Sequence, residues 1–145
     1  MDLHFFKEPF RDRQHPELVR LLFEADKSAG LVEGYSDFYM YIWIDSRNTM
    51  DGFQTILDEE FAMTFKAPAQ IEFGAITTQS IGRTIRESKS MVKRKKMLRL
   101  LDGSRCEYFP DLLGMVGAIA RGEVDVNRTL DGKEARYLKK LMKGR

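Results

Sequence analysis

The chain has few of the side chains that most catalytic and metal sites use. It contains one cysteine, Cys106, and two histidines, His4 and His15, in 145 residues. A lone cysteine excludes an internal disulfide and any Cys-x-x-Cys zinc or redox pair. Cys106 has no identifiable base beside it, which favours a buried thiol over a nucleophile. Neither histidine has a partner at zinc-site spacing. We therefore expect no catalytic residue, no metal ligand and no cofactor, and a binding protein rather than an enzyme.

Long apolar runs are also missing. No stretch approaches the roughly 20 residues that span a bilayer. The first residues, MDLHFFKEPFRDR, lack the cationic lead and the apolar core of a secretory signal. No glycine-rich loop matches a phosphate-binding cradle. These observations predict a cytoplasmic protein that does not use a membrane.

Acidic and basic residues are unevenly distributed along the chain. Residues 1–75 hold 7 Lys/Arg and 14 Asp/Glu, whereas residues 76–145 hold 17 and 8, so a net charge of +2 combines −7 and +9. The separation suggests a polyanion partner for the basic half and a protein partner for the acidic N-terminal half. The alternative is that the fold mixes the two halves on one evenly charged surface.

Apolar spacing predicts one α+β domain over residues 1–145, mostly helical, with a small sheet. Residues 38–44 are aromatic and β-branched, which favours a strand, with a buried helix as the competing interpretation. Trp43 is expected in the core. Asp58, Glu59 and Glu60 are expected on the solvated face of a helix. Helical spacing or helix-start residues predict helices that begin at Pro16 and that span 51–65, 76–99, 110–120 and 133–143, the last with Asp131 and Glu134 as a capping pair.

Residues 76–99, ITTQSIGRTIRESKSMVKRKKMLR, combine order, periodicity and charge most densely. Ile81, Ile85 and Val92 fall on one helical stripe. The stretch ends in four consecutive cations, Lys93, Arg94, Lys95 and Lys96. A cationic run of this kind attracts phosphates without regard to sequence.

The residues PAQIEFGAITTQSIGRTI, from 68 to 85, resemble the helix-turn-helix of bacterial DNA-binding proteins. Ile76-Thr77 matches the opening of the recognition helix, and the succession from Ser80 to Arg83 matches its body. The resemblance implies that Thr78, Gln79, Arg83 and Arg86 reach base edges or phosphates. An ordinary capped helix with a solvated cationic face is the alternative interpretation.

The function that these patterns favour is nucleic-acid binding by a small transcriptional regulator, with DNA a better candidate than RNA. The alternative is a protein-binding modulator of a larger nucleic-acid machine, for example a polymerase-binding regulator. The patterns also leave a homodimer open. The expected nucleic-acid-binding residues are Thr78, Gln79, Arg83, Arg86, Lys93, Arg94, Lys95 and Lys96.

Overall fold

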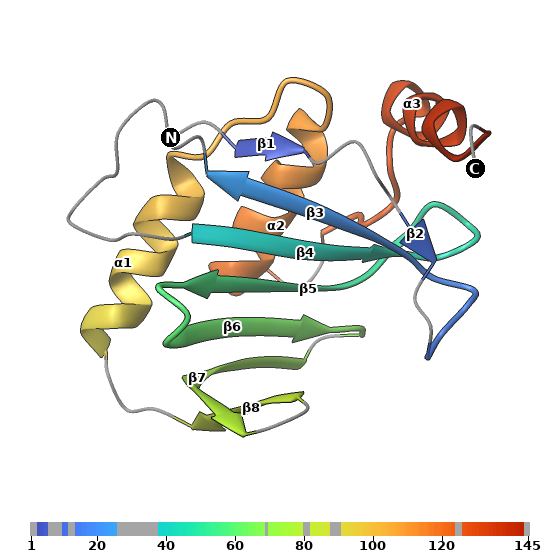
Figure 1. Ribbon diagram of the computed structural model, residues 1–145. Coiled ribbons are helices and arrows are strands. Elements are labelled where there is room, and N and C mark those ends of the chain that lie inside the picture. Colours follow the sequence, from blue (N-terminus) through green and yellow to red (C-terminus); the bar gives the residue numbers. More distant parts are fainter. Residues whose placement is uncertain are drawn as a thin grey trace.

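The computed structural model describes residues 3–5, 10–11, 14–25, 38–68, 70–79, 82–87, 91–123 and 126–143 (Figure 1). Eleven elements follow one another along these residues: β1 (Leu3–Phe5), β2 (Phe10–Arg11), β3 (Val19–Ala25), β4 (Phe38–Ile44), β5 (Met50–Leu57), β6 (Phe61–Lys66), β7 (Gln70–Gln79), β8 (Gly82–Glu87), α1 (Met91–Asp102), α2 (Pro110–Ala120) and α3 (Gly132–Lys143).

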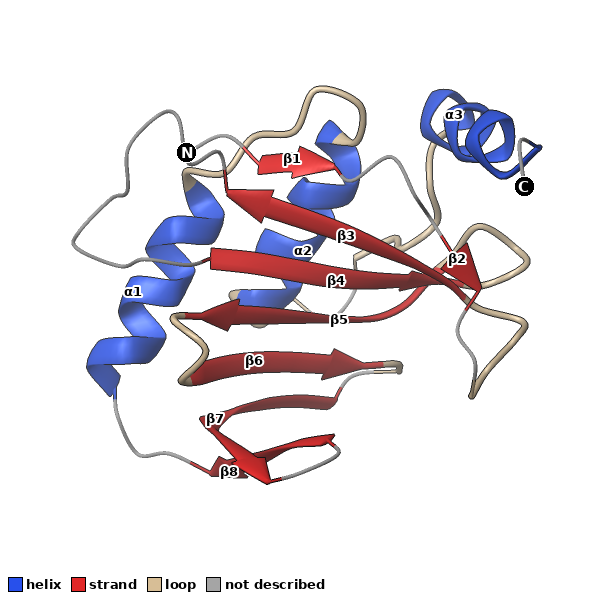
Figure 2. Ribbon diagram, viewed as in Figure 1, coloured by secondary structure: helices blue, strands red, loops and turns tan. Residues whose placement is uncertain are grey.

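The strands form one antiparallel sheet in the order β1-β3-β4-β5-β6-β7-β8, and β2 pairs with β3 (Figure 2). From β3 to β8 each strand pairs with the next one along the chain. The sheet is therefore a meander, in which neighbours in sequence are neighbours in space.

The main core lies between the sheet and the helices α1 and α2, which cover one of its faces (Figure 1). Alternate residues of the strands point into it, as the pleat requires. β4 shows this pattern in full, since every second residue from Phe38 to Ile44 is buried. α1 and α2 come from the basic half of the chain, whereas most strands come from the acidic half. The fold thus packs the two halves against each other.

The mostly helical fold expected from the sequence is wrong, because the sheet dominates the structure. The helix expected from Pro16 is β3. Leu21, Phe23 and Ala25 are buried at alternate positions, while Leu22, which completed the helical pattern, is only half-buried between them. The apolar residues of this short segment match both the helical period of 3.6 residues and the strand period of 2 residues. Packing against the rest of the fold selects the strand.

The helix expected at 51–65 is the hairpin of β5 and β6. Asp58 and Glu59 form its turn with φ values of 52° and 59°, and the Glu60 N–H donates to the Leu57 carbonyl at 3.1 Å. Positive φ at both central residues is what a type I′ turn requires, and since Leu57 pairs with Phe61, three residues connect the two strands. The acidic triplet is this turn rather than a helix face. Glycine or asparagine normally marks such a turn, and neither is present.

The helix expected at 76–99 is divided among β7, β8 and α1. Register pairs Ile76 with Ile85 and Thr77 with Thr84. These β-branched residues favour strands, where cross-strand pairs of this kind are stabilising. Among the described residues of this stretch, the helix begins at Met91, and it ends at Asp102, before Gly103.

Three other structural predictions agree with the structure. Phe38–Ile44 is a strand. α2 begins with Pro110 in its first turn and is buried from Met115 to Ala120. α3 spans Gly132–Lys143, and the Glu134 N–H donates to Asp131 Oδ1 at 2.7 Å, which is the expected cap.

Candidate functional site

The described residues of the segment that resembles a helix-turn-helix pair as two antiparallel strands; Ser80 and Ile81 lie outside the described residues. Thr78 and Gln79 lie near the end of β7, and Arg83 lies near the start of β8. Thr78 pairs with Arg83, and Gln79 pairs with Gly82. The recognition helix that the resemblance implies is therefore not formed by these residues, because they pair across strands instead.

Part of this hairpin extends beyond the rest of the sheet. β6 pairs with β7 only from Gln70 to Ala75, whereas β8 pairs with β7 from Gly74 to Gln79. Among the described strands, residues 76–79 and 82–85 thus pair only with each other. We call this two-stranded extension the hairpin arm.

The basic run lies at the start of α1. Arg94 and Lys95 are exposed and Lys96 is half-buried, while Met97 beside them is fully buried. The Arg94 guanidinium lies over the ring of Phe73, 4.4 Å from its centroid, in a cation–π contact. This contact fixes the start of α1 against β7.

The structure brings some of the expected binding residues together and separates others. Arg86 pairs with Ala75, two residues along β7 from Phe73, so it lies near the stretch that Arg94 contacts. Thr78 lies five residues beyond Phe73 along β7. The cations at the base of the hairpin arm are Arg86, Lys93, Arg94, Lys95 and Lys96. The arm itself carries Thr78, Gln79 and Arg83.

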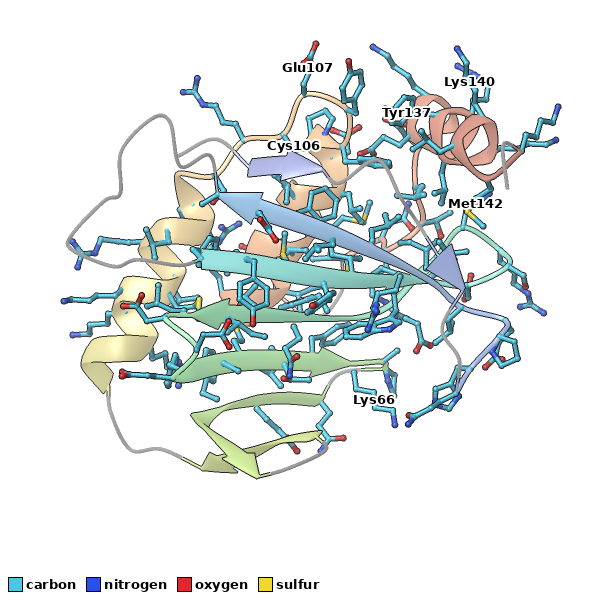
Figure 3. All side chains as sticks on the ribbon, viewed as in Figure 1. Lys66, Cys106, Glu107, Tyr137, Lys140 and Met142 are labelled. Atoms are coloured by element: carbon cyan, nitrogen blue, oxygen red, sulfur yellow. The ribbon has the colours of Figure 1, made fainter. Side chains whose placement is uncertain are left out.

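α3 carries a second group of cations. Lys133, Arg136, Lys140 and Lys143 are exposed at helical spacing, with Lys139 beside them. Figure 3 shows Lys140 on the outer side of α3 and Met142 on the side toward the sheet. The sequence shows this spacing but does not distinguish these residues as a binding site.

Three aromatic residues line the face of the sheet that α1 and α2 do not cover. Tyr39, Tyr41 and Trp43 alternate with the core residues of β4, and all three are half-buried. Their neighbouring ring centroids are 5.8 Å and 6.1 Å apart, and Arg20 lies over Tyr41 at 4.9 Å. The expectation that Trp43 belongs to the core is wrong, because the alternation of β4 places it on this opposite face.

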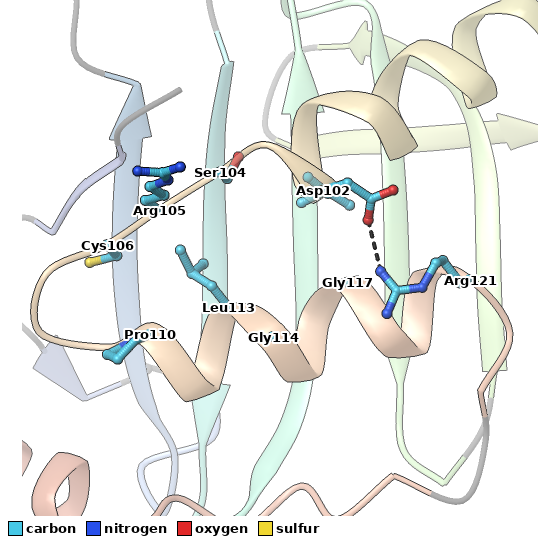
Figure 4. Close-up of a pocket in the computed structure, with 10 residues that line it drawn as sticks. Asp102, Ser104, Arg105, Cys106, Pro110, Leu113, Gly114, Gly117 and Arg121 are labelled. Carbon is cyan, nitrogen blue, oxygen red and sulfur yellow. Dashed lines mark hydrogen bonds and ion pairs between the residues drawn. The ribbon is translucent and has the colours of Figure 1, made fainter.

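A cavity of about 380 Å³ lies between the end of α1 and α2 (Figure 4). Two of its three charged residues, Asp102 and Arg121, form an ion pair at 2.7 Å. Cys106 lines it but is only 7% exposed, and burial raises the pKa of its thiol. A thiol in this environment is a poor nucleophile, as the sequence indicated.

Sequence reasoning missed a group of three carboxyls between the first turns of α2 and α3. Oxygen atoms of Asp111, Asp131 and Glu134 all lie within 4.8 Å of one another. Glu134 is 2% exposed, and its Oε2 accepts a hydrogen bond from the Leu112 N–H at 3.2 Å. We call this group the carboxylate cluster. The sequence identified Asp131 and Glu134 as a cap, but nothing in it indicated that Asp111 would join them.

The carboxylate cluster has unusual electrostatics. Burial raises the pKa of Glu134 from 4.5 to about 7; the charges of Asp131 and Asp111 add to this, while the Leu112 N–H opposes it. A hydrogen bond between their carboxyl groups raises the pKa of Asp111 and lowers that of Asp131. Within the described part of the chain, none of the three carboxyls forms a salt bridge with lysine or arginine.

Comparison of the chain with protein-family models, with curated proteins and with solved structures finds no match. Within the described ranges, no helix has the combination of length and apolar character that crossing a bilayer requires.

Proposed function

We propose that this protein binds DNA through the hairpin arm and the cations at its base. The observation that carries the proposal is the pairing register: β7 and β8 continue as a two-stranded ribbon beyond the point where β6 stops. The major groove of B-DNA is wide enough to admit either an α-helix or a two-stranded β-ribbon. A ribbon can therefore do what the sequence resemblance assigned to a helix.

The roles of the residues follow from their positions. Thr78, Gln79 and Arg83 lie on the hairpin arm, and their side-chain types donate to and accept from base edges. The cations at the base of the hairpin arm would contact phosphates: Arg86, Lys93, Arg94, Lys95 and Lys96. Phosphate contacts orient a protein on the duplex without reading its sequence. The Arg94–Phe73 contact supports this division, because it holds the start of α1 beside the strand from which the arm extends.

Duplex DNA suits this arrangement better than duplex RNA. The major groove of A-form RNA is deep and narrow, so a ribbon cannot reach its base edges. A role in transcription, a location in the cytoplasm and the absence of any catalysed reaction belong to the same proposal.

Binding can be tested by fluorescence anisotropy with a labelled DNA duplex at several salt concentrations. We expect the K93A/R94A/K95A/K96A variant to bind more weakly and with a smaller salt dependence. Each phosphate contact contributes about 0.9 to the slope of log affinity against log salt, so losing four contacts should lower the slope by about 3 to 4.

The matched control is R136A/K139A/K140A/K143A, which also removes four cations, but from α3. Far-UV circular dichroism should show that both variants keep their secondary structure. If the wild type does not bind a duplex at low salt, the proposal is wrong. If the α3 variant loses as much affinity and slope as the α1 variant, binding depends on net charge and the proposed interface is wrong.

A further inference from the structure

We propose that the carboxylate cluster of Asp111, Asp131 and Glu134 binds a hard divalent cation, with Ca²⁺ the preferred ion. Oxygens from all three residues lie within 4.8 Å of one another at the junction of α2 and α3. The inference is independent of DNA binding, because it concerns other residues and other elements.

The capping hydrogen bonds use only part of the oxygen atoms in the cluster. Asp131 Oδ1 accepts from the Glu134 N–H, and Glu134 Oε2 accepts from the Leu112 N–H. A carboxylate has two oxygens with about four acceptor sites. Glu134 therefore stabilises a helix N-terminus with one oxygen and retains the other for a ligand. Asp131 also shares a hydrogen bond with the Asp111 carboxyl, which a cation bound between them would replace.

The remaining oxygen of Glu134 is the observation that points to a ligand. Glu134 Oε1 is buried and has no hydrogen-bond partner, and the residue as a whole is only 2% exposed. A buried acceptor without a partner costs about 1–3 kcal/mol, and native proteins contain few of them. The N-termini of α2 and α3 explain why acidic residues gather here. They do not explain this oxygen, which the helix caps leave unused.

The charges around the cluster also favour a cation. Three acidic groups lie together without a lysine or arginine salt bridge in the described part of the chain. Lys133 is the cation whose charge acts on Asp131, but its effect is smaller than those of the hydrogen bonds that Asp131 accepts. A bound divalent ion would offset the mutual repulsion of the carboxylates and give Glu134 Oε1 a partner.

The chemistry of the ligands selects the class of ion. All three residues offer oxygen, which suits Ca²⁺, Mg²⁺ and Mn²⁺ better than the nitrogen- and sulfur-seeking Zn²⁺. Ca²⁺ binds oxygen at about 2.3–2.6 Å, so two oxygens on opposite sides of the ion are about 4.6–5.2 Å apart. The oxygen separations here are at most 4.8 Å, so one ion of this size can contact all three oxygens. Mg²⁺ binds at about 2.0–2.1 Å, demands nearly octahedral geometry and gives up its waters reluctantly, so a cluster of protein carboxylates suits it less well than Ca²⁺.

Solvent can reach the cluster from one side. Asp131 and Glu134 line a cavity of about 390 Å³ together with Glu107, Tyr108 and Tyr137. The rings of Tyr108 and Tyr137 stack at 4.7 Å. Asp111 and Asp131 are exposed, so an ion can enter and complete its coordination with water.

These tyrosines make a direct test possible. Tb³⁺ occupies oxygen-ligand Ca²⁺ sites, and its emission rises when a nearby tyrosine transfers excitation energy to it. We expect saturable tyrosine-sensitised Tb³⁺ emission from the wild-type chain, and displacement by Ca²⁺ at lower concentration than by Mg²⁺. D111N and D131N should each weaken Tb³⁺ binding by about tenfold or more, because each removes one charged ligand.

The control variant is E107Q, which removes a carboxylate from the same cavity but not from the cluster. It should bind Tb³⁺ like the wild type. Asn also caps helices, so D131N should fold, and D111N alters an exposed residue; circular dichroism checks both. The proposal is overturned if the wild type shows no saturable emission, if Ca²⁺ does not displace Tb³⁺, or if E107Q weakens binding as much as D111N does.

Discussion

The burial of Glu134 predicts a specific dependence of stability on pH. The pKa of this carboxyl is raised from 4.5 to about 7, mainly by burial. Below pH 4.5 the group is protonated in both the folded and the unfolded chain, and its contribution to the unfolding free energy is complete. Between pH 4.5 and 7 the unfolded chain releases the proton while the folded chain keeps it. The contribution is therefore lost as the pH rises through this range.

The size of the effect follows from the pKa difference. One pKa unit corresponds to 1.36 kcal/mol, so the shift of Glu134 amounts to at most about 3 kcal/mol. The groups that act on its pKa are Asp111 and the Leu112 N–H on α2 and Asp131 at the start of α3, and its own charge acts on the Cys106 thiol. Asp111 and Asp131 are exposed, so solvent screens their charges, and burial of Glu134 remains the main cause.

Urea unfolding followed by circular dichroism between pH 4 and pH 8, with EDTA present, measures this contribution. E134Q keeps an oxygen that can accept from the Leu112 N–H, but it cannot ionise. We expect the unfolding free energy of E134Q, relative to that of the wild type, to rise by up to about 3 kcal/mol across this range. E107Q, which changes an exposed carboxyl of the same cavity, should follow the wild type. If the wild type and E134Q show parallel pH profiles, Glu134 does not titrate as its burial requires.

Two further substitutions test other parts of the structure. Gly52→Ala places a Cβ 2.6 Å from the Phe65 carbonyl oxygen, so we expect about 1–3 kcal/mol of destabilisation in urea unfolding. Gly114→Ala is the control, because no atom lies within 4 Å of the added Cβ. Helix propensity predicts that it raises the unfolding free energy by about 1 kcal/mol. A lower unfolding free energy for Gly114→Ala would contradict the packing of α2. T78A/Q79A should reduce the preference for one DNA sequence over another while leaving the salt slope unchanged, and a changed slope in anisotropy titrations would assign these residues to phosphate contact instead.

The elements that sequence reasoning predicted correctly are those with a local signal. Pro110 fixes the start of α2, and Asp131 caps α3 with its own side chain. Both signals lie within four residues of the feature that they determine. Residues 38–44 were equally clear, because their length and β-branched or aromatic character suit a strand.

The strands that were mistaken for helices lack such a signal. Ile56 is buried on the face of β5 opposite Phe53 and Leu57, so β5 does not alternate cleanly, and its apolar residues also match helical spacing. The turn that follows contains Asp58 and Glu59 at positive φ, where glycine or asparagine is usual. Only pairing with β4 and β6 determines these residues, and a single sequence does not reveal that pairing.

The two candidate sites differ in how much of each could be anticipated. The base of the hairpin arm depends mainly on where cations stand in the chain, and a run such as Lys93 to Lys96 stays basic whether its neighbours are strands or helices. The assignment of Thr78 and Gln79 as base readers rests on helical order in the sequence, and in the fold it depends on the ribbon geometry instead.

The carboxylate cluster requires the N-terminus of α2 to meet that of α3, which brings Asp111 close to residues that are 20 or more positions away in the sequence. The charge of a side chain can be read from the sequence, whereas the grouping of distant carboxylates depends on the fold. For this reason the sequence indicated a basic interface but not the carboxylate cluster, although Asp131 and Glu134 were both already recognised as a helix cap.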